Sequence, residues 1–150
     1  MTRTLWIPMP MPNLNDLLAA ALSHRTVYGK LKRKWGGVVS LYARSQGFAA
    51  IDGPAHFEIE FVEPNRRRDP DGLVAGGTKI VFDALQEAGL LANDGWEHVL
   101  SILPTWRVDK AAPGVRLTVR EATKANPVSV GALPGPVTKP AGTGGATNAR

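Results

Sequence analysis

A chain of 150 residues is long enough for one domain with a modest core and too short for two. Its 43% hydrophobic and 21% charged residues are the balance of a soluble globular protein, and the absence of cysteine excludes disulfides, zinc-thiolate sites and cysteine nucleophiles. The net charge of +5 suits a polyanionic partner, while the lack of long apolar runs or an export signal predicts no membrane association and a cytoplasmic location.

The N-terminal third of the sequence predicts one strand and two helices. The segment "TLWIPM" (residues 4–9) is a short strand, which the prolines after it bring to an end. Asn13 or Asn15 can cap a helix through "LNDLLAAALSH", where leucine and alanine recur at helical spacing. A second helix is expected from about Thr26 into "LYARSQGF", interrupted or kinked near Gly36 and Gly37.

The stretch between Leu17 and Ile51 carries positive charge and no acidic residue. Its six cations are Arg25, Lys30, Lys32, Arg33, Lys34 and Arg44. Soluble proteins usually intersperse the two signs of charge, so this stretch favours a basic binding face. A helix whose charges are merely solvated stays an alternative.

The rest of the sequence predicts three strands and one helix. In "PAHFEIEFVEP" apolar side chains alternate with polar ones, which is typical of a strand with one wet face. An apolar stripe at helical spacing runs from Leu73 to Ala88, and Gly89 is well placed to end that helix. "HVLSILPTWRV" and "GVRLTVREA" predict two closing strands, joined by a turn around residues 110–113.

The order of these elements is β-α-α-β-α-β-β, which predicts an α/β fold of the α+β kind. We expect one domain over residues 1–123, with a small mixed sheet and helices packed on it. Residues 124–150 are rich in Pro, Gly and Ala, contain no acidic residue and show no periodicity. Such a segment cannot bury enough apolar surface to offset its ordering entropy, so we expect a disordered basic tail.

Charged residues crowd the segment "NRRRDPDGLVAGGTK" (residues 65–79), which sets three arginines beside two aspartates. It fails as a phosphate-binding loop, because that motif needs Gly-Lys-Ser/Thr and Thr78-Lys79 is reversed. "DPDG" fails as a calcium loop, because its glycine comes too early. Hard cations such as Mg²⁺ prefer carboxylate oxygens, so the pattern indicates a metal site beside a polyanion. The candidate residues are Asp69, Asp71, Lys79 and, further along, Asp94.

Each candidate also has an ordinary structural explanation. Asp71 can be a helix N-cap, which contributes about 1 kcal/mol. Lys79 can pair with Asp83 four residues later, and Asp94 can be the turn residue of "NDG". Taken together, however, the order in which these four residues follow the arginines favours a catalytic site. The arginines would hold backbone phosphates, and the lysine would orient water or offset charge on a phosphate.

The segment "RRRDPDGL…TKIVFDALQEAGLLANDGWEHV" resembles the core motif of the RusA family of Holliday-junction resolvases. That motif has Arg residues, Asp-x-Asp-Asn-Leu, a Lys, Asp-x-Leu, a helix-ending Gly and an acidic pair before a strand. "IPMPMPNLN" is similar to the opening of the family, and the likeness spans about residues 4–121. Gly72 replaces the usual Asn, Asn93 replaces the first of the acidic pair, and Lys79 lies about one turn further from Asp71. The loss of an acid at Asn93 could weaken metal affinity.

The resemblance implies a homodimeric endodeoxyribonuclease that nicks opposing strands of four-way DNA junctions with Mg²⁺, for which Mn²⁺ could substitute. It would act in the cytoplasm of a bacterium or of a phage-infected bacterium. Asp69, Asp71 and Asp94 would be the metal-binding carboxylates and Lys79 the catalytic lysine. The DNA-binding candidates are Asn13, Asn15, Arg25, Lys30, Lys32, Arg33, Lys34, Arg66, Arg67 and Arg68. The rival hypotheses are a non-catalytic branched-DNA-binding protein and a general flap or branched-DNA nuclease.

The expected helix raises a geometric problem for this site. If residues 73–88 form one straight helix, its ends lie roughly 24 Å apart at 1.5 Å per residue. Asp94 would then begin far from Asp69 and Asp71. Either the following loop doubles back, or the third carboxylate comes from the other subunit, and the resemblance favours a site that depends on the dimer.

Overall fold

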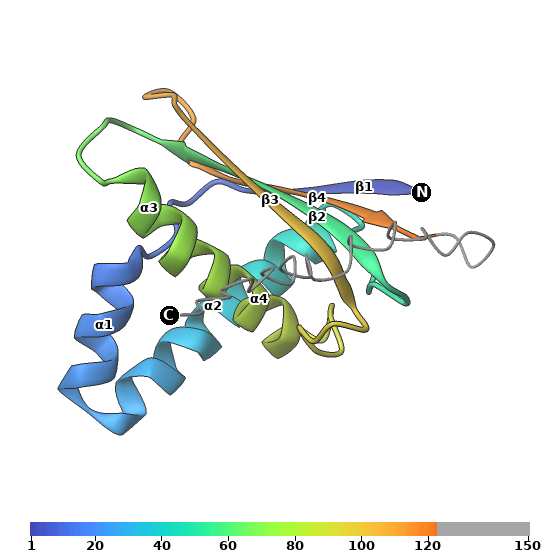
Figure 1. Ribbon diagram of the computed structural model, residues 1–150, viewed down its shortest axis with the longest axis horizontal. Helices are drawn as coiled ribbons and strands as arrows, with labels where there is room; N and C mark the ends of the chain where they lie inside the picture. The colour runs from blue at the N-terminus through green and yellow to red at the C-terminus, as the bar shows by residue number, and fades with distance from the viewer. Residues whose placement is uncertain (123–150) are drawn as a thin grey trace, which may run out of the picture.

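A four-stranded mixed sheet in the order β1-β4-β2-β3 organises the molecule (Figure 1). The computed structural model describes residues 1–122, so the expected tail at 124–150 lies outside the described residues. The strands are β1 (Thr2–Ile7), β2 (Ala55–Glu63), β3 (Val99–Val108) and β4 (Gly114–Glu121). β4 pairs antiparallel with β1 and β2, whereas β3 pairs parallel with β2 and forms one end of the sheet.

The helices all lie on one face of this sheet (Figure 1). They are α1 (Leu14–Ser23), α2 (Arg25–Ser45) and a helical stretch in three parts, α3 (Pro70–Gly72), a π-helical turn η1 (Leu73–Gly77) and α4 (Thr78–Glu87). The order β-α-α-β-α-β-β, the α+β class and the mixed sheet are therefore confirmed. No helix within residues 1–122 is long and apolar enough to cross a membrane.

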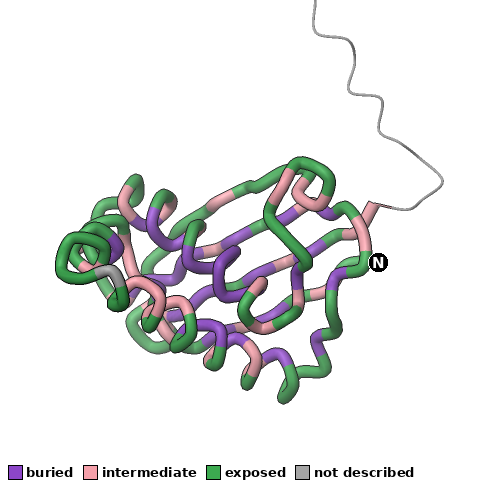
Figure 2. The backbone as a smooth tube through the Cα atoms, turned by 90° about the horizontal axis from the view of Figure 1, so that it is seen from below, coloured by how far each residue is buried: buried purple, intermediate pink, exposed green. Residues whose placement is uncertain are grey.

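The alternating pattern of β2 defines the core. Its odd-numbered residues from Ala55 to Phe61 are buried, and Ile59 lies between Leu117 of β4 and Pro104 of β3. Figure 2 shows buried segments alternating with more exposed ones along the strands. The helices cover this face, and the rings of Phe57 and Phe82 meet edge to face at 5.0 Å. The expected strand with one buried face is confirmed.

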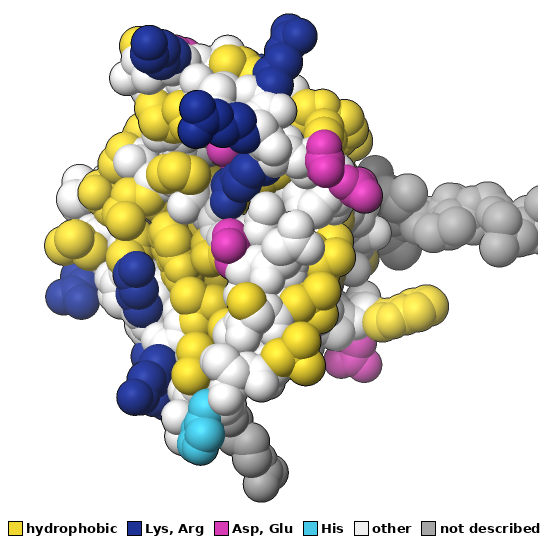
Figure 3. Space-filling model, turned by 90° about the vertical axis from the view of Figure 1, so that its left-hand side faces the viewer, with side chains coloured by type: hydrophobic (Ala, Val, Ile, Leu, Met, Phe, Trp, Pro, Cys, Tyr) yellow, Lys and Arg dark blue, Asp and Glu magenta, His cyan; other side chains and the backbone are white. Residues whose placement is uncertain are grey.

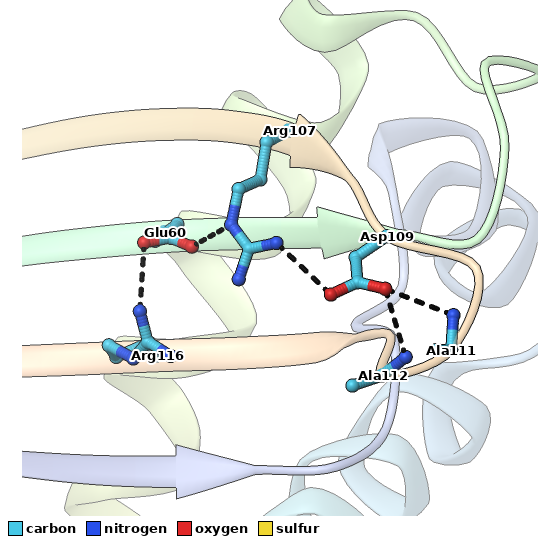
Figure 4. A network of polar contacts seen from close by, with 6 residues as sticks. All are labelled: Glu60, Arg107, Asp109, Ala111, Ala112 and Arg116. Carbon is cyan, nitrogen blue, oxygen red and sulfur yellow. Dashed lines mark hydrogen bonds and ion pairs between the residues drawn. The ribbon is translucent and has the colours of Figure 1, made fainter.

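The opposite, wet face of the sheet carries a network of charges (Figure 4). Glu60 accepts hydrogen bonds from Arg107 of β3 and Arg116 of β4. Asp109 begins the turn between β3 and β4, where its carboxylate accepts backbone N–H groups of Ala111 and Ala112. The N–H of Ala111 and the guanidinium of Arg107 hold the pKa of Asp109 below its usual range. The turn expected around residues 110–113 is confirmed.

The expected interruption of α2 near Gly36 and Gly37 is wrong, because the helix runs unbroken from Arg25 to Ser45. Gly36 instead allows close packing against α4. A Cβ atom placed on Gly36 would lie 2.5 Å from the Cβ of Glu87, whereas one on Gly37 would meet nothing within 4 Å. The glycine pair therefore marks a helix-helix contact on one side and open space on the other.

This contact predicts opposite effects for two adjacent substitutions. Gly36→Ala should destabilise the protein by about 1–3 kcal/mol, because the added methyl group forces α2 and α4 apart. Gly37→Ala should stabilise it by roughly 0.5–1 kcal/mol, because alanine restricts the unfolded chain and is the better helix former. Urea unfolding followed by circular dichroism measures both values. Equal effects of the two substitutions would mean that α2 and α4 are not in close contact.

Candidate active site and nucleic-acid interface

Asp69 and Asp71 lie at the beginning of the helical stretch that follows β2. Asp69 occupies the N-cap position but makes no side-chain cap hydrogen bond, and Pro70 begins the helix. Asp71 lies in the first turn, where its carboxylate accepts the N–H of Gly72 at 2.8 Å. Asp71 is therefore not the N-cap that its alternative explanation required. Both aspartates are exposed, and neither forms an ion pair within residues 1–122.

The helix behind these aspartates differs from the straight helix expected over residues 73–88. It begins at Pro70, and residues 73–77 form a π-helical turn, whose wider backbone changes the direction in which later side chains project. Two glycines in this turn lie where any larger side chain would clash with neighbouring segments. A Cβ on Gly76 would lie 2.1 Å from the backbone nitrogen of Leu14, and one on Gly77 would lie 2.4 Å from the ring of Phe61.

Lys79 follows the π-helical turn and pairs with Asp83. Its Nζ lies 3.2 Å from the carboxylate of Asp83, which is 6% exposed and also accepts the hydroxyl of Tyr28 at 2.5 Å. Burial raises the pKa of Tyr28 well above its ordinary value, and the hydrogen bond to Asp83 raises it further. The i, i+4 pair considered as the ordinary alternative is present. Its acidic member is buried, however, so the pair anchors Lys79 to the core and leaves its side chain half exposed.

Asp94 lies in the segment between α4 and β3 and is exposed. The turn role of "NDG" belongs to Asn93, whose side-chain oxygen accepts the N–H of Gly95 at 2.9 Å. Asp94 and Lys79 instead line a hollow of about 460 Å³ beside Ile102 and Pro104 of β3. The structure therefore brings two of the four predicted catalytic residues to one place.

Asp69 lines a different hollow, of about 540 Å³, next to the other end of β3. Its neighbours there include Arg66, Trp106 and Val108. Among the residues described, no three acidic or histidine side chains are close enough together to hold a metal ion. Asp69, Asp71 and Asp94, which the resemblance implies would bind Mg²⁺ or Mn²⁺, therefore form no such group within residues 1–122.

The predicted DNA-binding lysines of α2 lie on two faces of that helix. Lys30 and Lys34, four residues apart, line a hollow of about 860 Å³ together with Arg67 and Arg68. Figure 3 shows Lys and Arg side chains on this side of the molecule, bordering a broad patch of hydrophobic side chains. Lys32 faces the other way, with its Nζ 5.9 Å from the ring of Tyr28. Arg33 and Arg66 are exposed, and Arg25 is the first residue of α2.

Two of the predicted contacts to DNA, Arg68 and Asn13, have structural roles. Arg68 pairs with the carboxylates of Glu63 and Asp16 and donates to the carbonyl of Met11 at 2.7 Å, so its partly buried guanidinium already has three protein partners. Asn13 forms a capping box with Asp16 at the start of α1. Asn15 lies in the first turn of α1 and is exposed.

Glu63 is the residue that sequence reasoning missed. It is 8% exposed and forms a partly buried ion pair with Arg68. A signal for it was present, because Glu63 continues the odd-numbered, apolar phase of β2 and so had to point toward the core. A buried carboxylate needs a partner, and the arginines that follow β2 were the nearest cations in sequence.

No protein-family model matches the chain. No curated protein matches it either. The likeness to the RusA family therefore depends on the motif residues themselves.

Proposed function

We propose that this protein is a Mg²⁺-dependent, structure-selective endodeoxyribonuclease that resolves four-way DNA junctions as a homodimer. One observation carries the proposal. Asp69, Asp71 and Asp94 are exposed and, in the described part of the chain, free of ion pairs, although cations are abundant around them. Carboxylates with a purely structural role would be expected to cap a helix or pair with those cations.

The surrounding residues have distinct roles in this proposal. Arg66 and Arg67, which precede the aspartates, and Lys30 and Lys34 on α2 would hold DNA backbone phosphates. Lys79, fixed by Asp83, would offset the charge that develops on the phosphate under attack. Two identical sites related by a two-fold axis suit a junction that needs two symmetric nicks.

A non-catalytic branched-DNA-binding protein is the second candidate. The observation that favours it is that Asp69 and Asp94 of one chain line separate hollows. Such a protein would use the same basic residues and would not need the aspartates. A general flap or branched-DNA nuclease differs from the first candidate in substrate alone.

The test uses labelled four-way junctions, flaps and duplexes of matched sequence, incubated with the full chain in Mg²⁺, Mn²⁺ or EDTA. We expect paired symmetric nicks in the junction with Mg²⁺ or Mn²⁺, and no nicks in EDTA. Binding to the junction without any cleavage would favour the second candidate. Faster cleavage of flaps than of junctions would identify the general nuclease.

A further inference from the structure

Asp83 of α4 is a buried carboxylate that joins two helices. It is 6% exposed, accepts the hydroxyl of Tyr28 from α2 at 2.5 Å and lies 3.2 Å from the ammonium of Lys79. A buried carboxylate is costly unless hydrogen bonds and an opposite charge compensate it. Within residues 1–122 these two side chains are the hydrogen-bond partners of the carboxylate, so its placement depends on both.

The two partners of Asp83 meet at the same oxygen. Oδ2 accepts the Tyr28 hydroxyl at 2.5 Å, while Nζ of Lys79 lies 3.2 Å from Oδ2 and 3.4 Å from Oδ1. A hydroxyl-carboxylate bond of this length is of the short, strong kind, whereas the contacts of the lysine are long for a charged pair. Tyr28 therefore binds the carboxylate more tightly than Lys79 does.

A loosely held lysine keeps donors for a second partner. An ammonium group has three N–H donors, and the side chain of Lys79 is 57% exposed. In the described part of the chain its single ion pair is the one with Asp83. Lys79 also lines the hollow of about 460 Å³ that Asp94 lines. The ammonium can therefore stay with Asp83 and present free N–H groups to a ligand in that hollow.

Tyr28 stays a neutral donor near neutral pH. Burial raises the pKa of its hydroxyl well above the ordinary value, and the hydrogen bond to Asp83 raises this pKa further. The other charges nearby are Lys32, with its Nζ 5.9 Å from the ring of Tyr28, and Glu87, which lines a small hollow with Asp83 and Lys32. The hydroxyl that holds Asp83 therefore does not change its charge.

We propose that Tyr28 is a positioning residue for Lys79. By donating to Oδ2 of Asp83, it limits how closely the carboxylate draws in the ammonium, so the lysine stays directed toward the hollow beside β3. The catalytic part of this inference rests on the proposed function, in which Lys79 offsets charge on the phosphate under attack. Helix α2 would then contribute twice, because Lys30, two residues after Tyr28, lines the hollow assigned to DNA phosphates.

The alternative is that Tyr28 only ties α2 to α4. In that case Tyr28→Phe would lower the unfolding temperature and change neither Lys79 nor cleavage while the variant is folded. Tyr42→Phe is the matched control for every test, because Tyr42 is the other tyrosine of the chain and also lies on α2. Thermal unfolding shows which variants are folded at the assay temperature.

Acetylation of lysines, quantified by mass spectrometry, reports on Lys79 without DNA or cleavage. Tyr28→Phe should slow acetylation of Lys79 about two- to fivefold, because the carboxylate loses its stronger donor and draws the ammonium in. Asp83→Asn should speed it by about the same factor, because the ion pair is lost. Exposed Lys110 is the internal reference. Unchanged or faster labelling of Lys79 in Tyr28→Phe would overturn the proposal.

The contact itself is checked by titrating the phenol in the Tyr42→Phe background, where Tyr28 is the last tyrosine. Ultraviolet absorbance follows its ionisation. Because Asp83 raises the pKa of Tyr28, adding Asp83→Asn should let the phenol ionise at a lower pH. The same midpoint in both folded proteins would mean that Tyr28 does not contact Asp83, and the proposal would fail.

Steady-state kinetics tests the catalytic part. Tyr28→Phe should lower kcat for Mg²⁺-dependent junction cleavage about 10-fold or more and keep KM within about twofold, because a displaced group slows the chemical step and leaves binding intact. Tyr42→Phe should keep both constants within about twofold. A wild-type kcat in Tyr28→Phe, together with slowed labelling of Lys79, would overturn the catalytic role.

These measurements separate the inference from the proposed function. If the wild-type protein cleaves no DNA, the proposed function fails, while labelling and phenol titration still decide whether Tyr28 positions Lys79. If the protein cleaves junctions and Tyr28→Phe behaves like the wild type in labelling and kinetics, the proposed function survives and this inference fails.

Discussion

Asp71→Asn should lower Mg²⁺-dependent cleavage of a four-way junction by at least about 10³-fold while junction binding is kept or tightened. The substitution preserves shape and removes one negative charge that is exposed and, among the described ion pairs, unpaired. If this carboxylate holds a cation, its loss removes the chemistry. Because it otherwise repels phosphate, its loss does not weaken DNA binding. Nicking assays and gel shifts on one preparation measure both properties.

The control for this prediction is Asp52→Asn. Asp52 is also exposed, and it lies in the loop before β2, outside the segment of residues 65–79 that carries Asp69, Asp71 and Lys79. Its substitution changes the net charge of the protein by the same amount and should leave cleavage within about twofold. Asp71 also lies in the first turn of a helix, so its substitution should cost about 0.3–1 kcal/mol of stability. Nicking at the wild-type rate by Asp71→Asn would remove Asp71 from the site.

The fold could be predicted because its signals were local. The alternation in residues 55–61 gave the buried face of β2, and helical spacing with a capping asparagine gave α1. The glycines in α2 and η1 were harder to interpret. From the sequence alone, a glycine that interrupts a helix cannot be distinguished from one that lets another element pack closely. The neighbours of Gly36 and Gly76 come from segments distant in sequence, Glu87 and Leu14.

The candidate site was predictable as a set of residue types and not as an arrangement. The spacing of Asp69, Asp71 and Lys79 along the chain suggested one cluster, but the π-helical turn and the path from α4 to β3 place Lys79 with Asp94, apart from Asp69. The same holds for Arg68. Its position among three arginines suggested contact with phosphate, while the buried Glu63 opposite it decides its role.

The cations of α2 likewise divide between the hollow that Lys30 and Lys34 line and the opposite side of the helix, where Lys32 lies. Lys30→Ala/Lys34→Ala should weaken binding to junctions and duplexes together, because phosphate contacts carry no sequence information. For duplex arms, removing one phosphate contact should reduce the steepness of log affinity against log salt by about 0.9. Lys32→Ala/Arg33→Ala is the matched control.

The control removes the same formal charge from the same helix. Lys32 lies toward Tyr28 and the carboxylates of Asp83 and Glu87, away from the hollow that Lys30 and Lys34 share with Arg67. If the DNA follows that hollow, the control pair keeps the wild-type salt slope and loses affinity through the long-range field alone. Equal changes in slope for the two pairs would mean that the basic charge of α2 acts as a whole. A larger change for the Lys32 and Arg33 pair would move the DNA to the face of α2 beside α4.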